Sequence, residues 1–129
     1  MATTAAKAIK AQIDKETESY RQLQQDVQKN HTARLRFTQQ LSESKMVLQE
    51  LDLLDDEAVV YKLVGPALIR QDLVEAKANV DKRMDFMKKE SDRLDSSLKS
   101  LENKQLQAQQ AVQSLNQKLQ KFAPKQPEA

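Results

Sequence analysis

The sequence predicts a mainly α-helical protein, a long antiparallel coiled coil of two helices with a β-hairpin at the bend. Three observations lead to this fold class. The 129 residues include one glycine and three prolines, which is too few turn residues for a chain of many turns. Apolar residues recur at alternating steps of three and four along two long segments. Between these segments lies a short run rich in β-branched residues around a Gly-Pro pair.

The first predicted helix covers residues 9–51. Its a and d heptad positions, such as Ile13, Val27 and Leu41, are mostly apolar, and Gln, Lys, Glu, Asp, Ser and Arg fill most other positions. An apolar repeat of about 3.5 residues specifies a supercoiled helix with a narrow apolar seam. Because this seam would face water in an isolated helix, the helix needs a partner.

The second predicted helix covers residues 73–122 and carries the same repeat without a slip. Asp72, with Glu75 three residues later, resembles a capping box and is expected to start this helix. Pro124 is expected to end it and to leave residues 123–129 as a flexible tail. The two segments are similar in length, so each seam can be buried on the other within one chain.

The polar exceptions within the two seams suggest a register for the helix pair. In this register Val27 faces Leu98, and Arg34 faces Ser91, which places polar seam residues against each other. The register is a hypothesis about how the two helices are aligned.

Residues 58–70 are predicted to form a β-hairpin with Gly65-Pro66 at its turn. If Val64 pairs with Ala67, both faces of the hairpin carry apolar side chains, and both edges are open to further strands. We therefore expect hairpins from several chains to join in an oligomeric β-barrel; a helical turn that caps the coiled coil is the alternative. The predicted assembly residues are Val59, Val60, Tyr61, Leu63, Val64, Gly65, Pro66, Ala67, Leu68 and Ile69.

The sequence argues against an enzyme and against a cofactor or metal site. A single glycine excludes a P-loop and a dinucleotide-binding glycine triad, and the absence of cysteine excludes thiol chemistry and thiolate metal ligands. The one histidine, His31, falls on the flank of the first helix and is expected to be solvated. The 21 basic and 19 acidic residues nearly balance, so we expect neither nucleic acid nor a membrane surface as a partner.

The sequence also predicts a soluble, cytoplasmic protein. The first residues contain no apolar core of a secretory signal, and no stretch approaches the roughly 18 apolar residues of a membrane span.

The ends of the two predicted helices carry apolar residues beside small or polar ones. Two interpretations are open: a mobile apolar patch that binds partners, or an ordinary frayed coiled-coil end. The residues concerned are Ile9, Ile13, Val112, Leu115, Leu119 and Phe122.

The bend carries a resemblance to a known family. The segment VYKLVGPALIRQD, residues 60–72, resembles the hairpin of β-type subunits of the prefoldin family, most closely the subunit 6 branch in eukaryotes. The arms match that family by length and heptad layout over residues 9–122, although only residues 59–83 are diagnostic.

The resemblance implies one prefoldin β-type domain over residues 1–129 and an ATP-independent holdase cochaperone. In that family two α-type and four β-type subunits form a hexamer, so the implied partners are two α-type and three further β-type subunits. The hairpins build a double β-barrel, and the tips of the coiled coils hold unfolded clients such as actin and tubulin for the cytosolic group II chaperonin. Two alternatives stay open: a coiled-coil adaptor or tether that forms a simple oligomer, and a weak RNA-binding helical hairpin.

Overall fold

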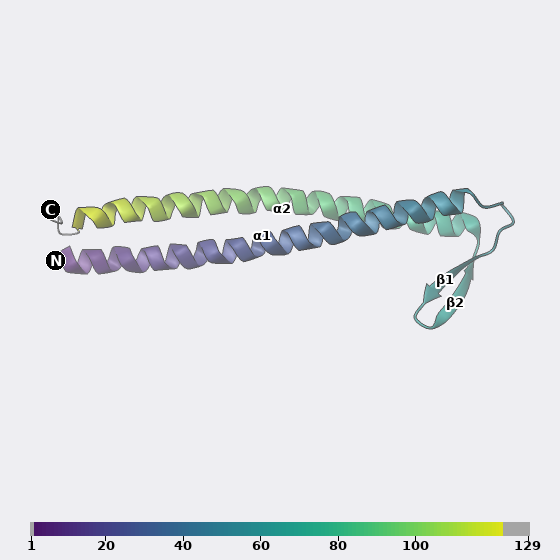
Figure 1. Ribbon diagram of the computed structural model, residues 1–129, viewed down its shortest axis with the longest axis horizontal. Helices are drawn as coiled ribbons and strands as arrows, with labels where there is room; N and C mark the ends of the chain where they lie inside the picture. The colour runs from purple at the N-terminus through teal and green to yellow at the C-terminus, as the bar shows by residue number, and fades with distance from the viewer. Residues whose placement is uncertain (1, 123–129) are drawn as a thin grey trace, which may run out of the picture. The chain divides into compact units, whose positions relative to one another are not determined.

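The computed structural model describes residues 2–122, with side chains from residue 4 onward. The elements follow in the order α1 (Ala2–Asp52), β1 (Val60–Val64), β2 (Ala67–Gln71) and α2 (Leu73–Phe122) (Figure 1). The predicted fold class, two long helices with a hairpin between them, is confirmed. The predicted flexible tail at residues 123–129 lies outside the described residues.

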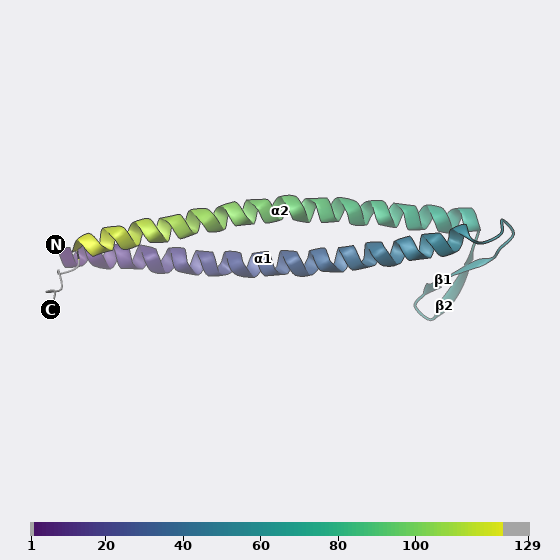
Figure 2. The same cartoon turned by 45° about the horizontal axis from the view of Figure 1, so that its top comes forward.

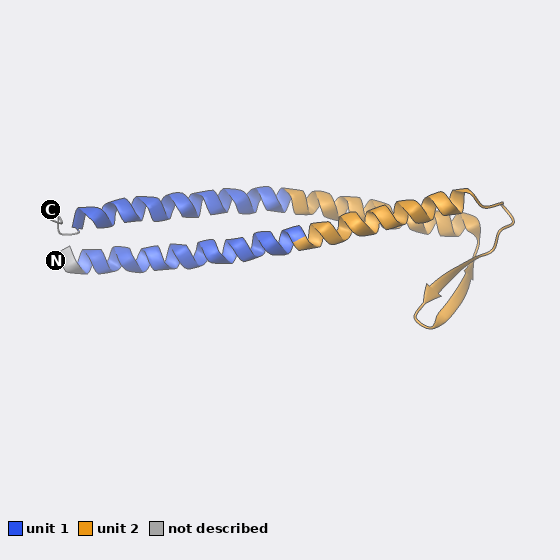
Figure 3. Cartoon of the chain, viewed as in Figure 1, with its two compact units in different colours: residues 1–31, 96–129 blue, residues 32–95 orange. Residues whose placement is uncertain are grey.

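The chain divides into two compact units, and both helices run through both of them (Figure 3). We call residues 1–31 with 96–129 the arm unit and residues 32–95 the hairpin unit. Within each unit a stretch of α1 lies beside an antiparallel stretch of α2 (Figures 1 and 2). The arm unit contains the first turns of α1 and the last turns of α2, and the hairpin unit contains the bend and both strands.

Helix α1 begins at Ala2, earlier than the predicted start at residue 9, and the alanines in this added segment are strong helix formers. Its last turn tightens, since the N–H groups of Leu53 and Leu54 donate to carbonyls three residues back at 3.2 Å. The N–H of Ala58 then donates to the Asp55 carbonyl at 2.9 Å and closes a turn before β1. Asp52, Asp55 and Asp56 therefore lie where α1 ends and the bend begins.

Helix α2 begins directly after Asp72, as the capping pattern predicts. The Asp72 carbonyl oxygen accepts a hydrogen bond from the N–H of Ala76 at 2.9 Å, which is the first turn of the helical ladder. Glu75 supplies a negative charge in this first turn, where the helix dipole favours it.

The hairpin has the predicted pairing, because Val64 pairs with Ala67 and Leu63 pairs with Leu68 across antiparallel strands. Gly65 has a φ of 56°, and Pro66 follows it in the two-residue turn. A glycine at the first central position is typical of a type II′ turn, which matches the twist of a hairpin. The Gly-Pro pair thus fixes the register of the strands.

The core of the hairpin unit joins the bend to the helix pair. Leu51, Leu73 and Ala76 form a buried cluster, and Val60 and Val80 pack against it. Leu51 retains only 8% of its surface exposed. Further along the helices the buried apolar residues are Met84, Met87 and Leu94 in this unit and Ala108 in the arm unit. All four fall on the repeat of alternating three- and four-residue steps that was predicted for residues 73–122.

Polar contacts also join the two helices of the hairpin unit. The Nη2 atom of Arg34 lies 3.0 Å from Oδ1 of Asp95, one helical turn beyond Ser91 in the predicted register. Side chains of a helix lean toward its N-terminus, so a long arginine in an antiparallel pair reaches past the residue directly opposite. The Oγ of Ser44, which is buried, lies 4.0 Å from the sulfur of Met87.

Candidate assembly and client-binding surfaces

Most of the predicted assembly residues are exposed on the hairpin. Leu63 and Leu68 form a cross-strand pair, and their exposed fractions are 70% and 67%. Tyr61, Val64 and Ile69 are also exposed. Large apolar side chains left in water at this density are unfavourable, and such patches are typical of surfaces that bind other proteins.

Val60 differs from the other predicted assembly residues. It is half-buried and packs against the cluster of Leu51, Leu73 and Ala76. Part of its side chain therefore belongs to the core of its own chain. Sequence reasoning missed this role, because alternation along a strand shows which residues share a face but not which face meets the helices.

The backbone of the hairpin offers two open edges. The described sheet has two strands, so each strand lacks a neighbour on its outer side. In a hairpin closed by a two-residue turn, the pair flanking the turn exchanges hydrogen bonds and the next pair directs its backbone groups outward. Leu63 and Leu68 are that next pair. Because the pattern alternates, Tyr61 and Arg70, two residues further along each strand, also direct their backbone groups outward. The most exposed side chains thus stand at the residues whose N–H and C=O groups are available for another strand.

The predicted client-binding residues all fall in the arm unit. Five of them are half-buried along the facing sides of the two helices, namely Ile9, Ile13, Val112, Leu115 and Leu119. Phe122, in the last turn of α2, is 44% exposed. The structure therefore brings the six residues into one unit and leaves part of each accessible.

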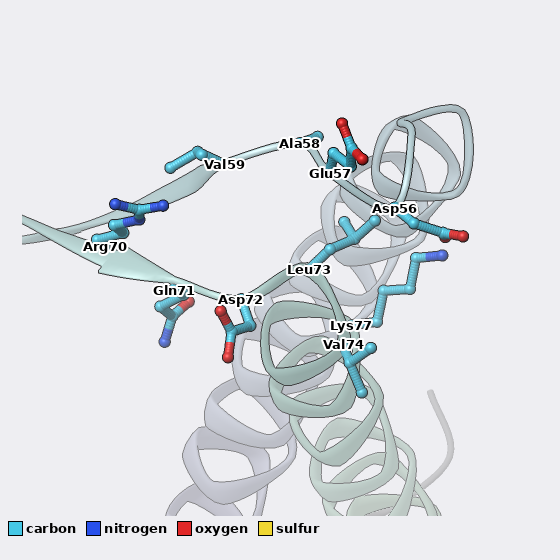
Figure 4. Close-up of a pocket in the computed structure, with 10 residues that line it drawn as sticks. All are labelled: Asp56, Glu57, Ala58, Val59, Arg70, Gln71, Asp72, Leu73, Val74 and Lys77. Carbon is cyan, nitrogen blue, oxygen red and sulfur yellow. The ribbon is translucent and has the colours of Figure 1, made fainter.

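A pocket of about 410 Å³ lies where the hairpin joins α2 (Figure 4). Asp56 and Glu57 of the bend, Arg70 of β2, and Asp72 and Lys77 beside or within α2 line it together with neighbouring apolar residues. The ammonium group of Lys77 lies 3.3 Å from Oδ1 of the aspartate that ends α1. Since charges of both signs surround this space, it does not select an anion or a cation.

Other surface features of the helices are structural. Hydrogen bonds to Glu18 and Glu90 raise the pKa of the Arg21 and Arg93 guanidinium groups, respectively. Within the described part of the chain, no group of three or more acidic or histidine side chains is placed to hold a metal ion. Between residues 2 and 122, neither helix has a stretch apolar enough to cross a bilayer.

The chain is similar to proteins of known family along most of its length. Residues 14–121 match the family model described as prefoldin subunit. The chain is 40% identical over 120 residues to prefoldin subunit 6 of Arabidopsis thaliana, covering 93% of both chains. It is 40% identical over 116 residues to human prefoldin subunit 6, covering 90% of both chains.

A solved structure agrees with these sequence relatives. The crystal structure of the prefoldin beta subunit from Thermococcus strain KS-1 is similar with a TM-score of 0.71 and 25% identity. The match covers 80% of this chain and 90% of that chain. The elements in common are two long helices with a two-stranded hairpin between them. The chain therefore belongs to the prefoldin family of non-enzymatic chaperone subunits, which assemble with other prefoldin subunits.

Proposed function

We propose that the chain is a β-type subunit of a cytoplasmic prefoldin hexamer with two α-type and three further β-type subunits. In this proposal the hexamer holds unfolded polypeptides, actin and tubulin among them, and passes them to the cytosolic group II chaperonin without ATP. The observation that carries the proposal is the hairpin, whose exposed apolar residues coincide with open strand edges. Family membership favours this function over a coiled-coil adaptor that forms a simple oligomer.

Assembly is proposed to occur by strand addition at the hairpin. A strand from a neighbouring subunit that pairs beside Leu63 or Leu68 satisfies the outward backbone groups and covers their side chains at once. Apolar burial stabilises such a contact by about 25 cal/mol per Å² before entropic costs. Several hairpins can close a barrel and leave no strand edge in water.

Client binding is proposed at the free ends of the helices in the arm unit. The half-buried residues there, with Phe122 partly exposed, offer an apolar surface too small for tight binding by one subunit. When several such tips surround one client, each bound tip raises the effective concentration of the next. Weak contacts then sum to useful capture, while each stays reversible enough for transfer.

The hairpin variant Leu63→Asp with Leu68→Asp tests the assembly part. Both side chains are exposed, so the helices should keep their circular dichroism while the variant fails to enter the hexamer in native mass spectrometry. Leu35→Asp is the matched control, since Leu35 is 69% exposed on α1 away from the hairpin. Normal hexamers from the double variant would contradict the proposed assembly surface. Val60 is unsuitable for this test because it also packs in the chain's own core.

The client part is tested by removing residues 1–12 and 112–129 together. The shortened subunit should still assemble through its hairpin, but the hexamer should suppress aggregation of chemically unfolded actin less well. Phe122→Ser is the finer variant, and Leu106→Ser is its control because Leu106 is 54% exposed but lies away from the helix end. Equal protection of actin by the full-length and shortened forms would place client binding elsewhere.

Transfer of the client requires a separate measurement. Labelled actin bound to the hexamer should move to added group II chaperonin in the absence of ATP, as followed by native gel electrophoresis. Retention of actin on prefoldin under these conditions would contradict direct transfer.

A further inference from the structure

A groove of about 210 Å³ lies between the hairpin and the helix pair, within the hairpin unit. Leu51, Val60, Ala76 and Val80 belong to its lining and connect it with the buried cluster of this unit. The groove is therefore an opening in the side of the core, at the place where the hairpin leaves the helices.

The apolar lining of the groove extends into solvent. Val47 of α1 lines it and is 48% exposed. On the hairpin, Val60, Lys62 and Val64 share one face of β1, because side chains alternate along a strand. Ile69 pairs with Lys62 and stands on the same face, and it is exposed as well. Apolar side chains thus continue from the floor of the groove along the hairpin face that starts at Val60.

The charged residues that line the groove are basic. Lys62 of β1 and Arg83 of α2 are both exposed, and the lining includes no Asp or Glu. Among residues 4–122 neither cation has an acidic partner within ion-pair distance, whereas Lys77 and Arg34 in the same unit both have one. An apolar space edged by two unpaired cations is complementary to an apolar side chain flanked by carboxylates.

We propose that the groove binds an acidic, apolar segment of the neighbouring prefoldin subunit in the assembled complex. This inference rests on the proposed assembly through the hairpin and adds a second contact to it. The groove is continuous with that surface, since β1 supplies Val60, Tyr61 and Lys62 to its lining. A subunit whose strand pairs with the hairpin is therefore the partner best placed to reach the groove.

The chain itself carries a segment of the required chemistry. Leu53 and Leu54 at the bend are exposed and are followed directly by Asp55 and Asp56. A related subunit with such a bend can present leucine to the apolar floor and carboxylates to the basic edge of the next subunit. A contact of this head-to-tail kind uses two different surfaces and can be repeated around a closed ring.

The charge of the groove is tested with Arg83→Glu in the full chain, co-expressed with its partner subunits. Lys82→Glu is the matched control, because Lys82 is the exposed neighbour on α2 and does not line the groove. In a dilution series followed by native mass spectrometry, Arg83→Glu should raise the subunit concentration for half-assembly by roughly tenfold more than the control. The difference should shrink as salt is added, since exposed charges are screened. Equal assembly of the two variants would overturn the proposal.

The occupant is identified by zero-length cross-linking of the intact complex with a carbodiimide, which joins an amine to a carboxylate in direct contact. Lys62 should be linked to an Asp or Glu of another prefoldin subunit, next to an apolar residue. A link from Lys62 to this chain alone, or no link at all, would overturn the proposed occupant. A link to a bound client would assign the groove to client binding and would also overturn it.

The two assembly hypotheses fail in different ways. If Leu63→Asp with Leu68→Asp prevents assembly but Arg83→Glu behaves like Lys82→Glu, strand addition stands and the groove contact is refuted. If the hairpin double variant assembles normally, the proposed function loses its assembly surface whatever the groove variants do.

Discussion

The turn of the hairpin offers a test in which conformation and packing are separated. Gly65 has a φ of 56°, and a Cβ atom placed on it would meet no atom within 4 Å. In Gly65→Ala the new methyl group therefore has room, and the only expected penalty is the left-handed backbone conformation. For an L-residue that penalty is about 1–2 kcal/mol.

This penalty should act on the hairpin alone. In the described chain the two strands pair only with each other, and Val60 is the strand residue that packs against the buried cluster. Because the hairpin can open without the helices, about 1–2 kcal/mol should raise the ratio of open to closed hairpin by roughly 5–30-fold. The helices should be unaffected, because Gly65 lies outside both.

Amide hydrogen exchange of the isolated chain measures this effect directly. The cross-strand amides of Val64 and Ile69 should lose roughly 5–30-fold of their protection in Gly65→Ala, while amides near Met87 in α2 should keep theirs. Gly65→Asn is the control, since asparagine adopts the left-handed conformation more readily and should lose less protection. Unchanged strand protection in Gly65→Ala, or an equal loss in α2, would refute the reasoning.

Three further changes test the packing of the hairpin unit by urea unfolding followed with circular dichroism. Leu51→Ala removes a side chain that is 8% exposed and should lower the free energy of unfolding by about 2–5 kcal/mol, whereas Leu35→Ala, at a site 69% exposed, should change it by less than about 0.5 kcal/mol. Arg34→Ala should lower the free energy of unfolding by less than about 1 kcal/mol, because the side chains of its ion pair with Asp95 are 43% and 40% exposed. A double-mutant cycle of Arg34 and Asp95 whose coupling energy exceeds this value and persists in high salt would contradict that estimate. Ser44→Ala should be nearly neutral, within about 1 kcal/mol, because the hydroxyl is 4.0 Å from a methionine sulfur, a weak acceptor; a larger loss would reveal a stronger role for the hydroxyl.

The sequence was sufficient for the elements and for the pairing of the strands. The heptad repeat predicts the helices because seam residues such as Leu73 and Met87 must be buried, and both are. The pairing of Val64 with Ala67 was predictable because a two-residue turn leaves one register open. In both cases the pattern depends on residues close together in the chain.

The sequence did not predict side-chain contacts that depend on how separate elements are oriented relative to one another. Arg34 lies in the predicted seam, but its length carries it to Asp95, one turn from the residue expected opposite. Heptads do not show which flank of the helix pair the hairpin approaches, so the contribution of Val47 and Arg83 to a groove beside β1 was not predictable. The roles of the assembly and client residues also stay predictions, since they depend on other chains.

The position of Val60 has a consequence for when a subunit becomes competent to assemble. Its side chain packs against the cluster of Leu51, Leu73 and Ala76, whose members come from the two helices on either side of the bend. The strand that we propose for docking is therefore held in place only after the helix ends have met. A chain whose helices have not paired lacks this support and presents a poorly ordered strand to its neighbours. Assembly of the complex would in this way act as a filter that admits folded subunits and leaves unfolded ones outside.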